Sequence, residues 1–204
     1  MAELTPQVLK RRARLGIVWL AARTGLLQLI VLGGTVMLAR LLEPRDFGIY
    51  AIVQFTMTFF MYFGDAGLGA ALIQKKTTPS QRELSSVFYL QLGVALVLVA
   101  IVGLGAELMR YLWSDLPAEA VWLMRVLSLG LVLTMLRVIP AILMERELLF
   151  GRLSAVDVAG SVSFYFTAVT LAWLDFGVWA LVVGSLAQGL VSTALALGLR
   201  PWRP

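Results

Sequence analysis

Six long apolar stretches, separated by short polar segments, make up most of this 204-residue chain. The hydrocarbon core of a bilayer is about 30 Å thick, so a spanning helix needs about 20 mostly apolar residues whose backbone hydrogen bonds are satisfied within the helix. Only 14% of the residues are charged and the mean hydropathy is +0.87, whereas a soluble domain has about 25% charged residues. The sequence therefore predicts an all-α, polytopic membrane protein. Its predicted spans are 15–39, 47–73, 86–106, 121–144, 153–174 and 176–199.

The ends of two spans have alternatives. The fourth span contains Arg125, Arg137 and Pro140, which allow its ends to shift by a turn, and the second has an alternative end near Gly64. The chain starts with a basic segment, 1–14, and the apolar stretch after it is too long for the apolar region of a cleavable signal peptide. We therefore expect a retained first helix, a six-helix membrane domain over residues 15–199, and a short tail over residues 200–204.

Basic residues are distributed unevenly over the two sides of this topology. Twelve lie on the side that holds both termini, four lie on the opposite side, and Arg23 lies within the first span. The positive-inside rule then predicts that both termini are cytoplasmic. It also explains the net charge of +5 without nucleic acid, for which the loops are too short to form a basic surface. The twelve are Lys10, Arg11, Arg12, Arg14, Lys75, Lys76, Arg82, Arg137, Arg146, Arg152, Arg200 and Arg203, and the four are Arg40, Arg45, Arg110 and Arg125.

Residue types needed for most enzyme sites are missing. The chain has no cysteine and no histidine, which excludes disulfides, thiolate chemistry, imidazole acid–base catalysis and most zinc sites. It also has no phosphate-binding loop, no HExxH and no GxSxG motif, and the glycine-rich run at 64–69 ends an apolar helix instead of joining a strand to a helix. We predict a protein that is not an enzyme, with no catalytic residue, cofactor or metal.

A short repeat opens two of the spans. The sequences DFGIYAIV (46–53) and DFGVWALV (175–182) both lie where a helix enters from the predicted outer face. We expect Asp46 and Asp175 to accept hydrogen bonds from free amides of the first helical turn. Two origins explain the similarity of these octapeptides. Both helices converged on the same sequence for starting at the membrane surface, or an ancestral helical hairpin was duplicated, and eight residues do not decide between them.

Polar residues inside the spans fall into stripes at helical spacing, which predicts that the first, second, fifth and sixth spans face one another or a shared wet cavity. The third has little beyond Gln91 and is expected to face lipid. The alternative is that these groups join helices, at about 1 kcal/mol or less per bond. The stripes are Thr24, Gln28 and Thr35 in the first span; Tyr50, Gln54, Thr58 and Asp65 in the second; Ser154, Asp157, Ser161 and Tyr165 in the fifth; and Ser185, Gln188 and Ser192 in the sixth.

Charged residues inside the spans are harder to explain by hydrogen bonding between helices alone. A charge at the centre of a membrane helix costs about 2.5–3.5 kcal/mol on insertion scales, so Arg23 and Asp65 need a partner, a cavity or a route to the surface. For Arg23 we favour a cation in a functional cavity over a structural ion pair, for which Asp65 is the candidate partner. Asp157 lies near the cytoplasmic end of its span, where a solvated or capping role is expected. The candidate substrate path consists of Arg23, Gln28, Gln54, Thr58, Asp65 and Gln188.

Four segments resemble a known family. ARLLEPRDFGIYA (39–51), GLGAALIQKK (67–76), RELLF (146–150) and FGVWALVVGSLAQ (176–188) are similar to the N-terminal half of bacterial polysaccharide exporters. These are the O-antigen and exopolysaccharide flippases of the multidrug/oligosaccharidyl-lipid/polysaccharide exporter superfamily. The resemblance covers nearly the whole chain.

The resemblance implies a transporter of two six-helix lobes in the bacterial inner membrane, which moves undecaprenyl-pyrophosphate-linked oligosaccharide to the outer leaflet. Relatives line the central cavity with cations that meet the pyrophosphate, and Arg23 is the position that fits this role. An ion gradient and the downhill flow of the cargo both remain open as the driving force.

Members of the family have twelve to fourteen helices, so we expect a fragment without its second lobe, or a lobe that pairs with another six-helix chain or a second copy. There are two alternatives for the function. The first is a non-transporting scaffold subunit of a polysaccharide-synthesis complex in the membrane, and the second is an exporter of another amphipathic cargo.

Overall fold

The structure, a computed structural model, describes the backbone of residues 6–65, 72, 74, 77, 79–112, 117–202 and 204, and the side chains of these except 6–20, 63–65 and 108–112. The described part is all-helical, which confirms the predicted fold class. Its six helices are α1 (Pro6–Leu41), α2 (Pro44–Asp65), α4 (Gln81–Leu112), α5 (Ala118–Arg146), α6 (Phe150–Trp173) and α7 (Val178–Leu199).

Five of these helices contain a stretch long and apolar enough to cross a membrane: those in α1, α4, α5, α6 and α7. The sixth, α2, has 22 residues and so extends about 33 Å at 1.5 Å per residue. It ends one residue past Gly64, and residues 66–71 of the predicted second span lie outside the described part. Helix α1 begins at Pro6, so it also includes most of the basic segment that was predicted to precede the first span.

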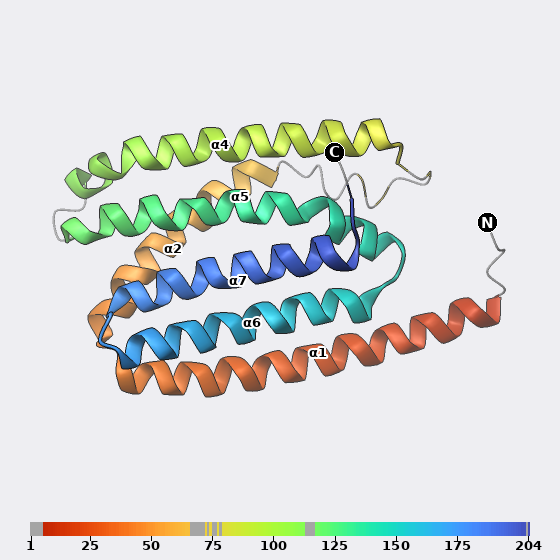
Figure 1. The fold of residues 1–204 in the computed structure, drawn as a ribbon, viewed down its shortest axis with the longest axis horizontal. Helices are drawn as coiled ribbons and strands as arrows, with labels where there is room; N and C mark the ends of the chain where they lie inside the picture. The colour runs from red at the N-terminus through yellow and green to blue at the C-terminus, as the bar shows by residue number, and fades with distance from the viewer. Residues whose placement is uncertain are drawn as a thin grey trace.

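Five helices lie side by side in one layer, in the order α4, α5, α7, α6 and α1, and α2 runs obliquely across this layer (Figure 1). Helix α2 packs mainly on α5 and also contacts α4 and α7. We call the end of the layer where α4 and α6 begin and α5 and α7 end the basic end, because Arg82, Arg146, Arg152 and Arg200 lie there. Both the first described residues of α1 and the last residues of the chain lie toward this end (Figure 1).

Short connections hold the helices in this order. Only Leu42 and Glu43 separate α1 from α2, so the charged segment between the first two spans is a tight turn. The amide of Leu42 still donates to the carbonyl of Leu38 at 2.8 Å, and Pro44 then begins the next helix. Proline suits this first position because its fixed backbone angle is helical and its missing N–H would have no partner there.

The two Asp-Phe-Gly turns lie against each other at the opposite end of the layer. Asp46 lies in the first turn of α2, where its carboxylate accepts a hydrogen bond from the amide of Glu43 at 3.3 Å. Gly177, which has a φ of +53°, caps α7 beside the Asp46 carboxylate. Asp175 instead lies in the turn before α7, with a φ of +59°. The prediction that Asp175 accepts hydrogen bonds from the first turn of its helix is wrong, because α7 begins three residues later and has Gly177 at its N-cap, with no side-chain cap hydrogen bond.

Helix α5 is central to the fold, since it contacts α2, α4, α6 and α7. Its buried residues Leu123 and Met124 form a core with Val53 and Met57 of α2 and Val182 of α7. The helix is continuous through Pro140, begins three residues before the predicted fourth span and ends two residues after it.

The guanidinium of Arg125, a quarter of the way along α5, is held at the face toward α4. Its Nε donates to the carbonyl of Gly103 at 3.1 Å, and it forms an ion pair with Glu107 at 3.4 Å. It also lies over the ring of Trp122, 5.1 Å from the centroid. This charge therefore has partners on the neighbouring helix.

Helix α4 has two different faces. Leu96 and Leu104 on one face are 54% and 84% exposed. On the other face Gln91 is almost fully buried, and its amide oxygen and nitrogen have no hydrogen-bond partner. The helix predicted to face lipid thus exposes one apolar face and packs the other against α5.

Candidate substrate path

Helices α1 and α6 meet at a glycine. The ring of Tyr165 lies against the backbone of Gly34, where any Cβ would collide with it. The hydroxyls of Thr35 and Tyr165 are 3.3 Å apart, and Leu38 packs on Ala168 one turn further along both helices. The residue numbers of the contacts increase together in both helices, from Gly34 and Tyr165 to Leu38 and Ala168, so α1 and α6 are parallel neighbours.

An ion pair joins the same two helices nearer the basic end. Arg23 of α1 and Asp157 of α6 are 2.7 Å apart between Nη2 and Oδ2, and their side chains are 30% and 24% exposed. Asp157 lies seven residues after the start of α6, about 10 Å along the helix. The pair therefore lies about two turns into α6 and within the apolar span of α1, which begins at Ala21, and it remains partly open.

This pair corrects two predictions. The partner of Arg23 is Asp157, where Asp65 was the expected candidate, and the side chain of Asp65 lies outside the described residues. Of the solvated or capping role expected for Asp157, the capping part is wrong, because α6 begins at Phe150 and Asp157 lies beyond its first turn, while its side chain is 24% exposed. Asp157 stands in the polar stripe of the fifth predicted span with Ser161 and Tyr165, and that stripe was the available signal for a role inside the helix bundle.

The polar stripes of α2 and α7 also meet. The hydroxyls of Tyr50 and Ser185 are 2.7 Å apart, and Ser185 donates to the carbonyl of Leu181 in its own helix at 2.9 Å. Two stripes that were predicted to face each other are therefore in contact at this point.

Gln188 of α7 lies against α6 beside Gly160. A Cβ on Gly160 of α6 would come 3.4 Å from Cγ of Gln188 and would collide with the hydroxyl of Ser192. Gly160 is three residues from Asp157, so Gln188 and Arg23 contact α6 at levels about one turn apart along its axis. The structure thus brings two of the predicted path residues to one region of α6.

A pocket of about 410 Å³ lies between α2 and α5. Thr58 lines it, and the hydroxyl of Thr58 donates to the carbonyl of Gln54 at 2.9 Å. Thr134 of α5 lines the same pocket and donates to the carbonyl of Gly130. Thr134 was missed by the sequence analysis because a single threonine in an otherwise apolar stretch forms no stripe. The pocket thus contains one threonine from α5, a helix that was not among the four predicted to face a shared cavity, and the rest of its α5 lining, Met135 and Val138, is apolar.

The remaining path residues are on the surface of the described chain. Gln28, Gln54 and Gln188 all have exposed side chains, each on a helix rich in exposed apolar residues. Amide side chains in such a position are poorly suited to lipid and well suited to water or to a polar ligand.

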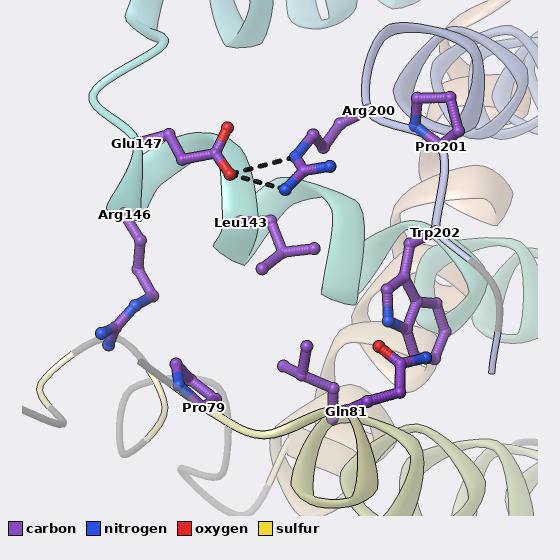
Figure 2. Close-up of a pocket in the computed structure, with 9 residues that line it drawn as sticks. Pro79, Gln81, Leu143, Arg146, Glu147, Arg200, Pro201 and Trp202 are labelled. Atoms are coloured by element: carbon purple, nitrogen blue, oxygen red, sulfur yellow. Dashed lines mark hydrogen bonds and ion pairs between the residues drawn. The ribbon is translucent and has the colours of Figure 1, made fainter. Parts of the chain in front are cut away.

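A second pocket, of about 550 Å³, lies at the basic end, between the start of α4, the end of α5 and the segment after α7 (Figure 2). Arg200 pairs with Glu147 through Nε at 3.1 Å and Nη2 at 2.6 Å. Arg146 donates to the carbonyls of Leu72 at 2.6 Å and Thr77 at 2.9 Å. Trp202 packs edge-to-face on Phe88, with ring centroids 5.2 Å apart. These contacts anchor the end of the chain to α4 and α5.

The part of the chain that the structure describes contains no group of three or more acidic residues placed to hold a metal ion. The polar groups on the path are amides, hydroxyls and one ion pair. Groups of these kinds can form hydrogen bonds with sugar hydroxyls and with a phosphate.

Comparison with known proteins gives one family and two relatives. The family described as polysaccharide biosynthesis protein matches residues 37–204. The succinoglycan biosynthesis transport protein ExoT of Rhizobium meliloti (strain 1021) is 29% identical over 154 residues, which cover 76% of this chain and 31% of that protein. A Klebsiella pneumoniae protein described as an uncharacterized membrane protein in the cps region is 33% identical over 135 residues, which cover 64% of this chain and 27% of that protein.

The chain therefore spans less than a third of the length of either relative. No solved structure matches it.

Proposed function

This chain belongs to the polysaccharide biosynthesis protein family, and on that basis we propose that it forms one lobe of an exporter that moves lipid-linked oligosaccharide across the bacterial inner membrane. The observation that carries the proposal is the partly open Arg23–Asp157 pair within the apolar length of α1 and α6. Ionisable residues inside a membrane are expensive and usually mark a pathway for a substrate or an ion.

The chemistry of the cargo fits these side chains. An undecaprenyl pyrophosphate needs a positive counter-charge in a region of low dielectric constant, and a guanidinium provides several N–H donors for phosphate oxygens. We assign this role to Arg23, and we assign contacts with sugar hydroxyls to Gln28, Gln54, Thr58 and Gln188. The printed name of the Rhizobium relative, a succinoglycan biosynthesis transport protein, supports a polysaccharide cargo.

The lobe needs a partner to enclose a path. Gln28, Gln54 and Gln188 are exposed on apolar helices, so a second lobe or a second copy of the chain would cover them. The relatives are more than three times as long as their matched segments, which supports a second lobe. In the membrane we place the basic end on the cytoplasmic side, because twelve of the seventeen basic residues belong to that side of the proposed topology.

The experiment replaces Arg23 at the chromosomal locus with alanine or lysine and measures delivery of the glycolipid to the outer leaflet. Arg23→Ala is expected to reduce delivery by at least about tenfold, since one charge-assisted hydrogen bond to the phosphate is lost. Arg23→Lys keeps the charge and should retain part of the delivery. Arg82→Ala removes an exposed arginine at the start of α4 and is the matched control.

Normal delivery by a well-inserted Arg23→Ala variant would contradict the proposal. If deletion of the chain stopped polymer synthesis while Arg23→Ala had no effect on it, the scaffold reading would be favoured. Delivery of a different amphipathic molecule that depends on Arg23 would identify another cargo.

A further inference from the structure

The Arg23–Asp157 ion pair has unsatisfied polar atoms on both sides of it. Among the residues that the structure describes, neither the buried Nε of Arg23 nor the buried hydroxyl of Ser154 has a hydrogen-bond partner. The shortest contact of the pair, of 2.7 Å, joins Nη2 of Arg23 to Oδ2 of Asp157, and a guanidinium has five N–H donors. Because buried polar groups are nearly always paired, these two groups each have the capacity for one further hydrogen bond beside the ion pair.

Ser154 provides a second partner for Asp157. The two residues are three positions apart in α6, so their side chains lie on the same side of the helix, about 60° apart around its axis. Ser154 is only 5% exposed, and its hydroxyl is a donor that a carboxylate can accept from. A rotation of the Asp157 side chain is the movement that would join them.

A phosphate group provides the second partner for Arg23. Both side chains of the pair are about a quarter to a third exposed, so an anion can reach the guanidinium without unfolding of either helix. A neutral sugar cannot replace the carboxylate, because it would leave an unpaired charge inside the membrane. A pyrophosphate carries the charge and enough oxygens to accept from both Nη2 and the unpaired Nε.

We propose that Asp157 is an exchangeable counter-ion of Arg23, which neutralises the guanidinium in the empty lobe and moves to Ser154 when a pyrophosphate takes its place. This inference rests on the proposed function, since it takes the ligand to be the pyrophosphate of a lipid-linked cargo. Competition from Asp157 weakens binding of the cargo. A transporter needs this, because its ligand must bind strongly enough to enter and weakly enough to leave.

The test measures binding of farnesyl pyrophosphate to the purified protein in lipid nanodiscs. Asp157→Asn keeps the shape of the side chain and removes its charge, so it should bind the probe about tenfold more tightly than the unmodified protein. Delivery of glycolipid in cells should fall at the same time, because release is slowed. If Asp157 only held Arg23 in place, Asp157→Asn would bind the probe more weakly than the unmodified protein, because the side chain of Arg23 would no longer be fixed.

Three controls separate the possible outcomes. Farnesol, which has no phosphate, should bind equally to all variants. Arg23→Ala should lose pyrophosphate binding with or without Asp157→Asn. Ser154→Ala keeps the ion pair and should bind about threefold more weakly, since Asp157 loses its second partner; this variant decides the matter if Asp157→Asn does not fold.

The inference would be overturned if Asp157→Asn bound the probe no more tightly than the unmodified protein, or if Ser154→Ala had no effect. In either case, loss of binding by Arg23→Ala would leave the proposed function standing. Unchanged binding by Arg23→Ala would remove the proposed function as well.

Discussion

Two neighbouring glycines in α1 have different surroundings. A Cβ on Gly34 would collide with the ring of Tyr165, whereas a Cβ on Gly33 would meet nothing within 4 Å. Gly34 is therefore required for the close approach of α1 to α6, and the ion pair of Arg23 with Asp157 depends on that approach. Small residues serve this purpose in many membrane helix pairs.

We predict that Gly34→Ala destabilises the protein and that Gly33→Ala does not. Overpacking of this kind costs about 1–3 kcal/mol, and each kcal/mol lowers the melting temperature of a protein of this size by about 2–4 °C. Thermal unfolding in detergent micelles would measure the difference. Equal melting temperatures for the two variants would mean that α1 and α6 are not held together at Gly34.

At the scale of the elements, the segment after α7 is fixed to α4 and α5 by two kinds of contact, of which Figure 2 shows the ion pair of Arg200 with Glu147. The ion pair of Arg200 with Glu147 is in contact with water, since these side chains are 35% and 42% exposed. Trp202 packs on Phe88, which is only 8% exposed and belongs to the core between α4 and α5. Apolar contact should therefore contribute more to this anchor than the ion pair.

Phe88→Ala is expected to destabilise the protein by about 3–5 kcal/mol, because it leaves a cavity under Trp202 and beside α5. Glu147→Gln should cost no more than about 1 kcal/mol, as exposed ion pairs do. Denaturation in detergent with each single variant and the double variant would measure both effects. A larger loss from Glu147→Gln than from Phe88→Ala would show that charge, and not packing, fixes this end of the chain.

Much of the helix arrangement was predictable from local pattern. The apolar stretches predicted the helices of the described part, and the contact of Tyr50 with Ser185 follows from polar stripes at helical spacing. These features depend on residues close together in the sequence, and helical periodicity reports them directly.

The contacts between distant helices were not predictable. Periodicity gives the face of each helix but not its neighbour, so Arg23 was known to need a partner while Asp157, on a helix far along the chain, could not be chosen over Asp65. For the same reason α5 was not recognised as the central helix. The position of Asp175 differs from that of Asp46 because the helices after the two Asp-Phe-Gly sequences begin at different positions relative to them.

At the scale of the whole molecule, α1 is an edge helix with little of its surface covered. Only 11% of its most apolar window is buried, against 39% in α5 and α7. Leu29 and Leu32 are 69% and 65% exposed on the same helix as Gln28. Lipid can solvate the leucines, but the amide needs water or a polar partner. The lobe therefore has apolar surface that lipid can cover and exposed amide groups that need water or a polar partner.

Single cysteines would separate these two surfaces, and the natural chain contains no cysteine that would interfere. We predict that cysteine at positions 28, 54 and 188 reacts with a water-soluble maleimide in membranes, because the thiolate is the reactive form and forms only in contact with water. Leu104→Cys, on the exposed apolar face of α4, is the control and should react much more slowly. If all four positions reacted at the same slow rate, Gln28, Gln54 and Gln188 would face lipid, and these three helices would share no wet path.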